Sequence, residues 1–74
     1  MVVKVIVLGS MLNEHRGTQY VELSDESTLL NLLKEVGLKA NSPFSYAVNG
    51  KIATVEKVLS HNDAVVIIPH ISGG

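Results

Sequence analysis

The chain has 74 residues with no cysteine and no tryptophan, and 6 Lys and Arg residues nearly balance 7 Asp and Glu residues. This length allows one small domain, and the 46% of hydrophobic residues predict an ordered core. The lack of cysteine excludes disulfides, a thiol nucleophile and a zinc-thiolate site.

The charge and the apolar runs indicate which large partners to expect. The net charge of −1 argues against sequence-independent binding to nucleic acid, which requires many Lys and Arg residues. The longest apolar runs are far below the roughly 18 residues of a membrane span. The N-terminus does not have the shape of a signal peptide. We therefore expect a cytoplasmic protein that binds neither nucleic acid nor a membrane.

The N-terminal part of the chain predicts two strands. Residues 2–8 are rich in β-branched side chains, which favours a strand buried on at least one face, and Gly9 ends it. Residues 10–16 are mostly polar and predict a helical turn or loop. Residues 18–23 then alternate apolar and polar side chains, so we expect a second strand that pairs with the first as a hairpin.

A helix is predicted to begin at Ser27 or Thr28, because either hydroxyl can cap the free backbone N–H groups of a first turn. Gly37 stands where a left-handed cap would end the helix. Four apolar side chains at i, i+3, i+4 and i+7 form one helical face, and they are Leu29, Leu32, Leu33 and Val36.

The C-terminal part predicts three further strands. Residues 46–48 and 51–54 flank Asn49-Gly50, which is a strong two-residue hairpin signal because both positions tolerate positive φ. Residues 55–59 are ambiguous and can hold a helical turn, and residues 60–63 are a turn cluster. Residues 64–68 are five consecutive apolar residues, typical of a buried central strand, and Pro69 ends it.

The resulting order β-β-α-β-β-β predicts an α+β fold of the β-grasp (ubiquitin-like) type. The two strands richest in Val and Ile lie at opposite ends of the chain, and both favour the middle of a mixed sheet. The helix is expected to pack diagonally across one face. We expect a domain over residues 1–69 and a flexible tail over residues 70–74.

The central strands are apolar on both faces, whereas the predicted helix can cover only one. An exposed apolar patch on a small domain suggests a surface for a partner. The residues predicted for this surface are Ile6, Leu8, Val65, Ile67 and Pro69.

The side chains do not suggest a catalyst acting alone. His15, His61 and His70 lack the spacing of metal ligands, so no metal site is predicted. The carboxylates are scattered, and the sequence has neither a nucleophile elbow nor a glycine-rich phosphate loop. We therefore expect no bound cofactor.

The C-terminal end carries the strongest chemical signal, because the printed sequence closes on Gly73-Gly74 shortly after a core strand. A free α-carboxylate can attack an activated phosphate, and the resulting acyl-adenylate is a good acyl donor. Glycines without Cβ allow close approach in a narrow tunnel. Five residues reach roughly 17 Å when extended. The residues expected to thread such a tunnel are His70, Ile71, Ser72, Gly73 and Gly74.

Several of these motifs together resemble the ubiquitin-like sulfur carriers. They are the Val48-Asn49-Gly50 turn, a turn ending in Asp63, the strand Ala-Val-Val-Ile-Ile-Pro at residues 64–69, and the terminal Ser72-Gly73-Gly74. The small subunit of molybdopterin synthase is the more similar branch, partly because residues 9–17 form a long first connection. The thiamine-pathway carrier is the second.

The resemblance implies a function centred on Gly74. This residue would be adenylated by a ubiquitin-activating-type enzyme that uses ATP, and then converted to a thiocarboxylate. Gly73 would provide clearance in the tunnel. In the molybdopterin branch the tail enters the large synthase subunit, which would own the catalytic residues. The pathway metal, molybdenum or tungsten, stays open.

Three alternatives remain at the level of the sequence. The chain can be a thiamine-type sulfur carrier for thiazole synthesis. It can be a ubiquitin-like modifier joined to lysines through Gly74, or a plain β-grasp interaction module whose tail is incidental.

Overall fold

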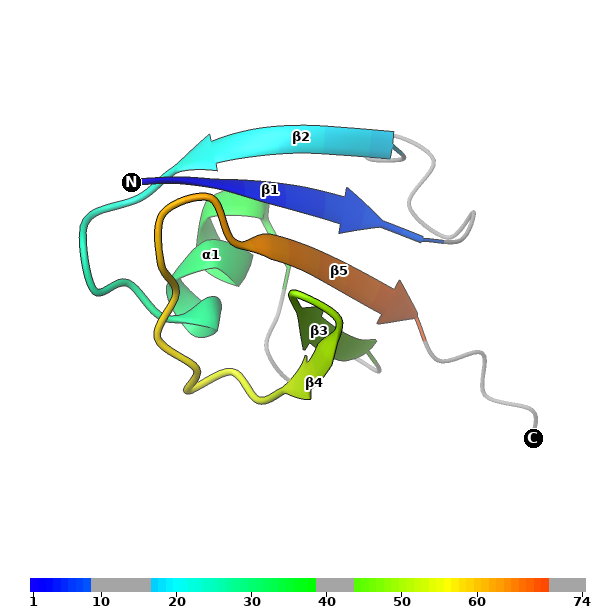
Figure 1. The fold of residues 1–74 in the computed structure, drawn as a ribbon. Helices are drawn as coiled ribbons and strands as arrows, with labels where there is room; N and C mark the ends of the chain where they lie inside the picture. Colours follow the sequence, from blue (N-terminus) through cyan, green and yellow to red (C-terminus); the bar gives the residue numbers. More distant parts are fainter. Residues whose placement is uncertain (9–16, 39–43, 70–74) are drawn as a thin grey trace.

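The computed structural model of this chain describes residues 1–8, 17–38 and 44–69. Their five strands form one mixed sheet in the order β2-β1-β5-β3-β4, and a helix packs across one face (Figure 1). The predicted α+β architecture is confirmed. The elements are β1 (Val2–Val7), β2 (Gly17–Glu22), α1 (Leu29–Val36), β3 (Phe44–Val48), β4 (Lys51–Ala53) and β5 (Ala64–Pro69).

The two Val- and Ile-rich strands lie side by side in the sheet, as predicted. Strand β5 occupies the middle, pairing in parallel with β1 and antiparallel with β3. Strand β2 pairs antiparallel with β1, with Val7 opposite Gly17. The predicted helical turn or loop at residues 10–16 lies outside the described residues.

Helix α1 begins and ends where its sequence signals place it. Thr28 is the N-cap: its Oγ1 accepts from the Asn31 backbone N–H, while Asn31 Oδ1 accepts from the Thr28 backbone N–H at 2.9 Å. Gly37 caps the C-terminus with φ of 84°. Because Leu29, Leu32 and Leu33 are fully buried, the predicted apolar face packs on the sheet.

The segment between β4 and β5 has no helical turn, contrary to one interpretation of residues 55–59. Residues 55 and 56 form a turn, and Val58 makes an isolated bridge with Thr28. The carbonyls of Val55 and Lys57 accept the N–H groups of Leu30 and Leu29, each at 2.9 Å. The free donors of the helix start therefore hold this segment in an irregular conformation.

The core lies between the helix and one face of the sheet. Strands β1, β3 and β5 contribute buried side chains to it, whereas the edge strands β2 and β4 contribute none. Leu23 and Leu59 close its ends. The buried residues are Val3, Val5, Val7, Leu23, Leu29, Leu32, Leu33, Tyr46, Val48, Leu59, Val65 and Ile67.

Candidate functional site

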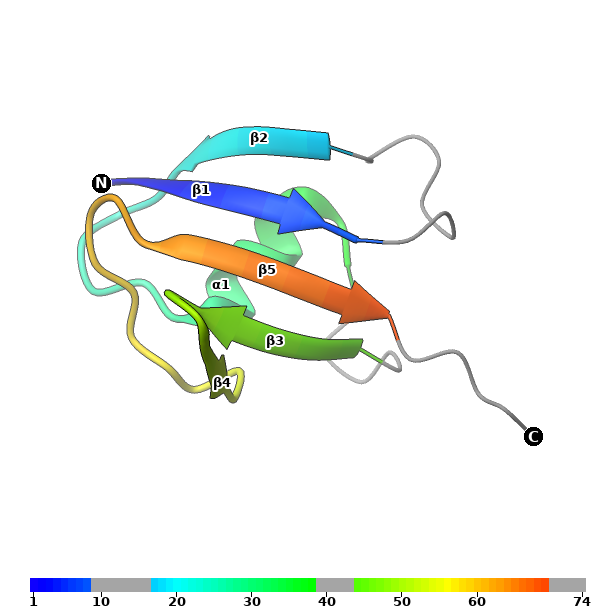
Figure 2. The ribbon, with the colours of Figure 1, turned by 45° about the vertical axis from the view of Figure 1, so that its right-hand side comes forward.

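The site predicted from the sequence begins where β5 ends. Strands β1 and β5 are parallel, so their C-terminal ends lie at the same edge of the sheet (Figure 2). The chain passes from Pro69 at this edge into residues 70–74. The predicted tail residues His70, Ile71, Ser72, Gly73 and Gly74 lie outside the described residues.

Two residues of the predicted partner surface belong to the core, and that part of the prediction is wrong. Val65 and Ile67 have 0% exposure and face helix α1. The cause is the register between the central strands, which pairs Val5 with Val65 and Val7 with Ile67. Residues paired across a sheet share a face, so the buried face of β1 fixes that of β5.

The opposite side of the sheet, here called the outer face, has no described element across it (Figure 2). The pairing places one residue from each strand in a row across this face. The row, from edge to edge, is Thr18, Ile6, Val66, Ala47 and Ile52.

The outer face is predominantly apolar near the end of β5. Ile6, Val66 and Ile68 are partly exposed there. Leu8, one residue past β1, is 45% exposed, and its N–H donates to the Ile67 carbonyl at 3.0 Å. Ile52 on the edge strand is 78% exposed. An exposed apolar surface of this kind is typical of a protein contact.

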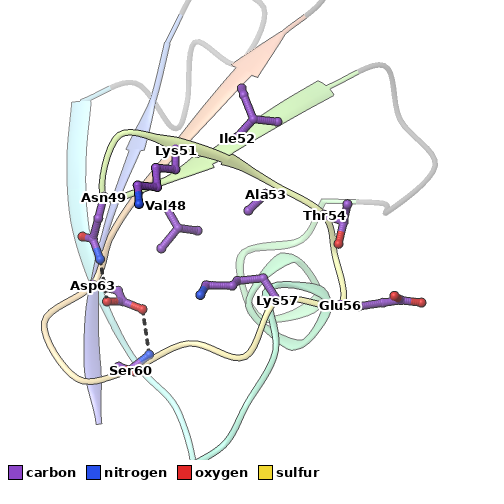
Figure 3. A pocket seen from close by; sticks show the side chains of 10 residues that line it. All are labelled: Val48, Asn49, Lys51, Ile52, Ala53, Thr54, Glu56, Lys57, Ser60 and Asp63. Carbon is purple, nitrogen blue, oxygen red and sulfur yellow. Dashed lines mark hydrogen bonds between the residues drawn. The ribbon is translucent and has the colours of Figure 1, made fainter.

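The opposite end of the sheet is closed by a side-chain clamp. Asn49 Nδ2 donates to Asp63 Oδ1 at 2.9 Å, and Asp63 Oδ2 accepts from the Ser60 N–H at 2.7 Å (Figure 3). Asn49 Oδ1 accepts from the Ala64 N–H at 2.9 Å. Sequence analysis missed this pair because it joins residues 14 positions apart.

A shallow hollow of about 710 Å³ lies beside this clamp (Figure 3). Lys51 and Lys57 point into it, whereas Glu56 points away. Both oxygens of Asp63 are engaged by the clamp, and the residue is 9% exposed. The polar groups of the clamp therefore fix local structure and do not form a reactive cluster.

The other polar groups of the described residues also have structural surroundings. His61 Nδ1 accepts from the Val2 N–H at 3.0 Å, and His15 and His70 lie outside the described residues. Burial raises the pKa of Tyr46, whose hydroxyl has no partner among the described residues. In the described part of the chain, no group of His, Cys, Asp or Glu side chains is arranged to hold a metal. No helix within residues 1–8, 17–38 and 44–69 could span a membrane.

Comparison with known families identifies the class of protein to which a chain with this fold and this sequence belongs. The model of the ThiS family matches residues 5–74, which is nearly the whole chain and includes Gly73 and Gly74. The chain belongs to the ThiS family of ubiquitin-like sulfur carriers.

Solved structures agree with this fold. SAMP1 from Haloferax volcanii is similar with a TM-score of 0.83 at 16% identity, and the match covers 100% of both chains. A chain in the complex of subunits 1 and 2 of the molybdopterin-converting factor from Helicobacter pylori matches with a TM-score of 0.67 at 23% identity, again over 100% of both chains. A ubiquitin-like protein from Caldiarchaeum subterraneum matches at 0.61 and 12% identity, covering 99% of this chain and 100% of that one. No curated protein sequence matches the chain significantly.

Proposed function

We propose that the chain carries sulfur on the carboxyl group of Gly74 and donates it in molybdopterin biosynthesis, as the small subunit of molybdopterin synthase. The observation that carries the proposal is the extension of the family match to residue 74. It is supported by the position of β5, which lies in the middle of the sheet and leads directly into the last five residues.

The proposed chemistry has two steps. A carboxylate oxygen of Gly74 attacks the α-phosphorus of ATP, and pyrophosphate leaves. Hydrosulfide (HS⁻) then attacks the acyl carbon and AMP leaves, which yields a thiocarboxylate and releases a proton. ATP is bound by the activating enzyme, and this chain binds no cofactor. The absence of cysteine fits this scheme because the sulfur is carried on the chain end.

In this scheme the body and the tail have separate tasks. Residues 1–69 are held by the partner, and residues 70–74 reach roughly 17 Å into its active site. Ordering each tail residue costs about 1–2 kcal/mol, so docking of the body has to offset that cost. The proposed docking surface keeps Ile6 and Leu8 from the sequence prediction and replaces the two buried residues with Val66 and Ile68. Pro69 is the last residue of β5, and its side chain lies outside the described part of the structure.

Two partners are proposed for this surface. One is a ubiquitin-activating-type adenylating enzyme, and the other is the large subunit of molybdopterin synthase. The complex of subunits 1 and 2 of the molybdopterin-converting factor from Helicobacter pylori supports the second, because one chain of that complex has this fold.

The first connection favours the molybdopterin branch over the thiamine branch. Val7 pairs with Gly17, so the nine residues from 8 to 16 join β1 to β2. In the thiamine-pathway carriers, which the sequence also resembles, a tight turn joins these two strands. The thiamine branch stays the second candidate because the matching family carries the name ThiS.

An assay with the thiocarboxylated protein separates these two pathways. The loaded chain is mixed with a large molybdopterin synthase subunit and the pterin precursor, and in parallel with a thiazole synthase and its substrates. We expect sulfur to appear in the pterin. Sulfur transfer only in the thiazole reaction would replace the first candidate with the second.

A modifier role is tested separately, since it begins with the same adenylation. A tagged form of the chain is expressed in cells of the organism that produces it, and its adducts with other proteins are sought by mass spectrometry. Isopeptide bonds between Gly74 and lysines would add this function to the carrier role, whereas their absence would remove it.

A further inference from the structure

The outer face carries one cationic side chain among its described strand residues, and that residue is Lys4. The cross-strand register places Lys4 between Tyr20 on β2 and Ala64 on β5. Its backbone N–H donates to the Asp63 carbonyl at 2.9 Å, so its position in the sheet is fixed. The neighbouring outward positions on β1 are the apolar residues Val2 and Ile6.

The ammonium group of Lys4 has no partner within the described residues. The ion pair found there joins the Met1 amino group to Asp25 and leaves Lys4 out. Glu22 is the acid on the same face, opposite Val2 at the outer edge strand, and it makes no ion pair with Lys4. Lys4 is nevertheless only partly exposed.

This arrangement constrains whatever covers the face. A purely apolar partner would remove water from the ammonium group without replacing its hydrogen bonds, and an unpaired buried charge is strongly unfavourable. A partner with a carboxylate opposite Lys4 avoids this loss and gains a charge-assisted hydrogen bond.

We propose that Lys4 determines which partners bind the outer face, by pairing with a carboxylate of the adenylating enzyme. The identity of this partner rests on the proposed function. A second copy of the chain fits less well, because a two-fold contact centred on this face would bring two Lys4 ammonium groups together.

Binding of Lys4 variants to the adenylating enzyme of the same organism tests the proposal. We expect Lys4→Met to weaken the affinity by about tenfold or more, and to flatten its dependence on salt concentration. Lys4→Arg keeps the charge and is expected to stay within about threefold of the native chain. Lys51→Met is the matched control, because Lys51 is a strand lysine whose partner Val48 faces the core, and it should leave affinity unchanged.

The melting temperature of each variant checks that the fold is retained, and we expect it to change little because the Lys4 side chain is outside the core. Equal or tighter binding by Lys4→Met, as expected of purely apolar docking, would overturn the proposal. If Lys4→Met fails to fold, Lys4→Gln provides the same loss of charge with the polar end retained, and native affinity in that variant would also overturn it.

Sulfur loading distinguishes this failure from failure of the proposed function. If the native chain and Lys4→Met bind and become thiocarboxylated equally, the carrier role stands and the role of Lys4 is wrong. If the native chain itself neither binds the adenylating enzyme nor becomes loaded, both are wrong.

Discussion

The side chains of Asn49 and Asp63 bond to each other across the start of β5, with Asn49 Nδ2 donating to Asp63 Oδ1 at 2.9 Å. The same Asn49 accepts from the Ala64 N–H and has the positive φ of 53° that its hairpin turn requires. One residue thus shapes the β3–β4 turn and fixes the beginning of the central strand. The clamp lies at the end of β5 opposite to Pro69, so it can hold the body without restricting the chain beyond that residue.

Two substitutions at Asn49 separate these contributions. Asn49→Gly keeps the turn but removes the side-chain bonds, leaving Asp63 short of a donor, and is expected to destabilise the fold by about 1–3 kcal/mol. Asn49→Ala adds a left-handed backbone cost of about 1–2 kcal/mol. Chemical denaturation measures both, and equal stability of the two variants would contradict the dual role.

Leu32→Ala should be among the most damaging single changes, because this side chain is fully buried between helix and sheet. The expected loss is about 2–5 kcal/mol in the free energy of unfolding. Leu30→Ala is the control on the same helix, where the side chain is only partly buried, and a smaller loss is expected. Similar losses for both leucines would contradict the assignment of the apolar face.

Tyr46→Phe is expected to stabilise the protein. The Tyr46 hydroxyl is buried without a partner among the described residues, and such a group costs about 1–3 kcal/mol. Removing it should raise the melting temperature, and an unchanged or lower value would argue that the hydroxyl is bonded.

The same residue predicts a pH dependence. Burial raises the pKa of Tyr46 above its ordinary value of 10.0, so the folded state holds this proton more tightly than the unfolded state. The contribution of the Tyr46 proton to the free energy of unfolding is fully present below pH 10. It is lost as the pH rises from there through the pKa of the folded state. Chemical denaturation at several pH values in this window should show that the free energy of unfolding declines less steeply in Tyr46→Phe than in the native chain.

Gly37→Ala isolates the cost of a backbone conformation. The φ of 84° is unfavourable for alanine, yet a Cβ at this position would meet nothing within 4 Å. The expected loss is therefore the backbone term alone, about 1–2 kcal/mol. Gly37→Asn should lose less, because asparagine tolerates this conformation, and a thermal melt ranks the three proteins.

The sequence predicts the elements well because their signals are local. Thr28 and Gly37 mark the helix ends, and Asn49-Gly50 marks the hairpin. The exposed face of β5 could not be predicted in this way, because all residues from 64 to 68 are apolar. Without alternating polar residues, the sequence does not show which side chains face the solvent. Only the pairing of Val5 with Val65 decides it.

The candidate site is predicted only in part for the same physical reason. Its proposed chemistry depends on two glycines that are visible in the sequence, whereas its docking face depends on register. Lys4 interrupts an apolar strand and looks unremarkable by itself. Its proposed role depends on the register, which places Lys4 between Tyr20 and Ala64.

The mass of the intact protein tests the central claim most directly. The native chain is incubated with the adenylating enzyme, ATP and a sulfur donor, beside a variant that lacks Gly73 and Gly74. We predict that one oxygen of the native chain is replaced by sulfur, that fragmentation places the sulfur on the carboxyl group of Gly74, and that the shortened variant gains none. A native chain whose mass does not change, or whose product in the cell continues past residue 74 without processing, would contradict the account.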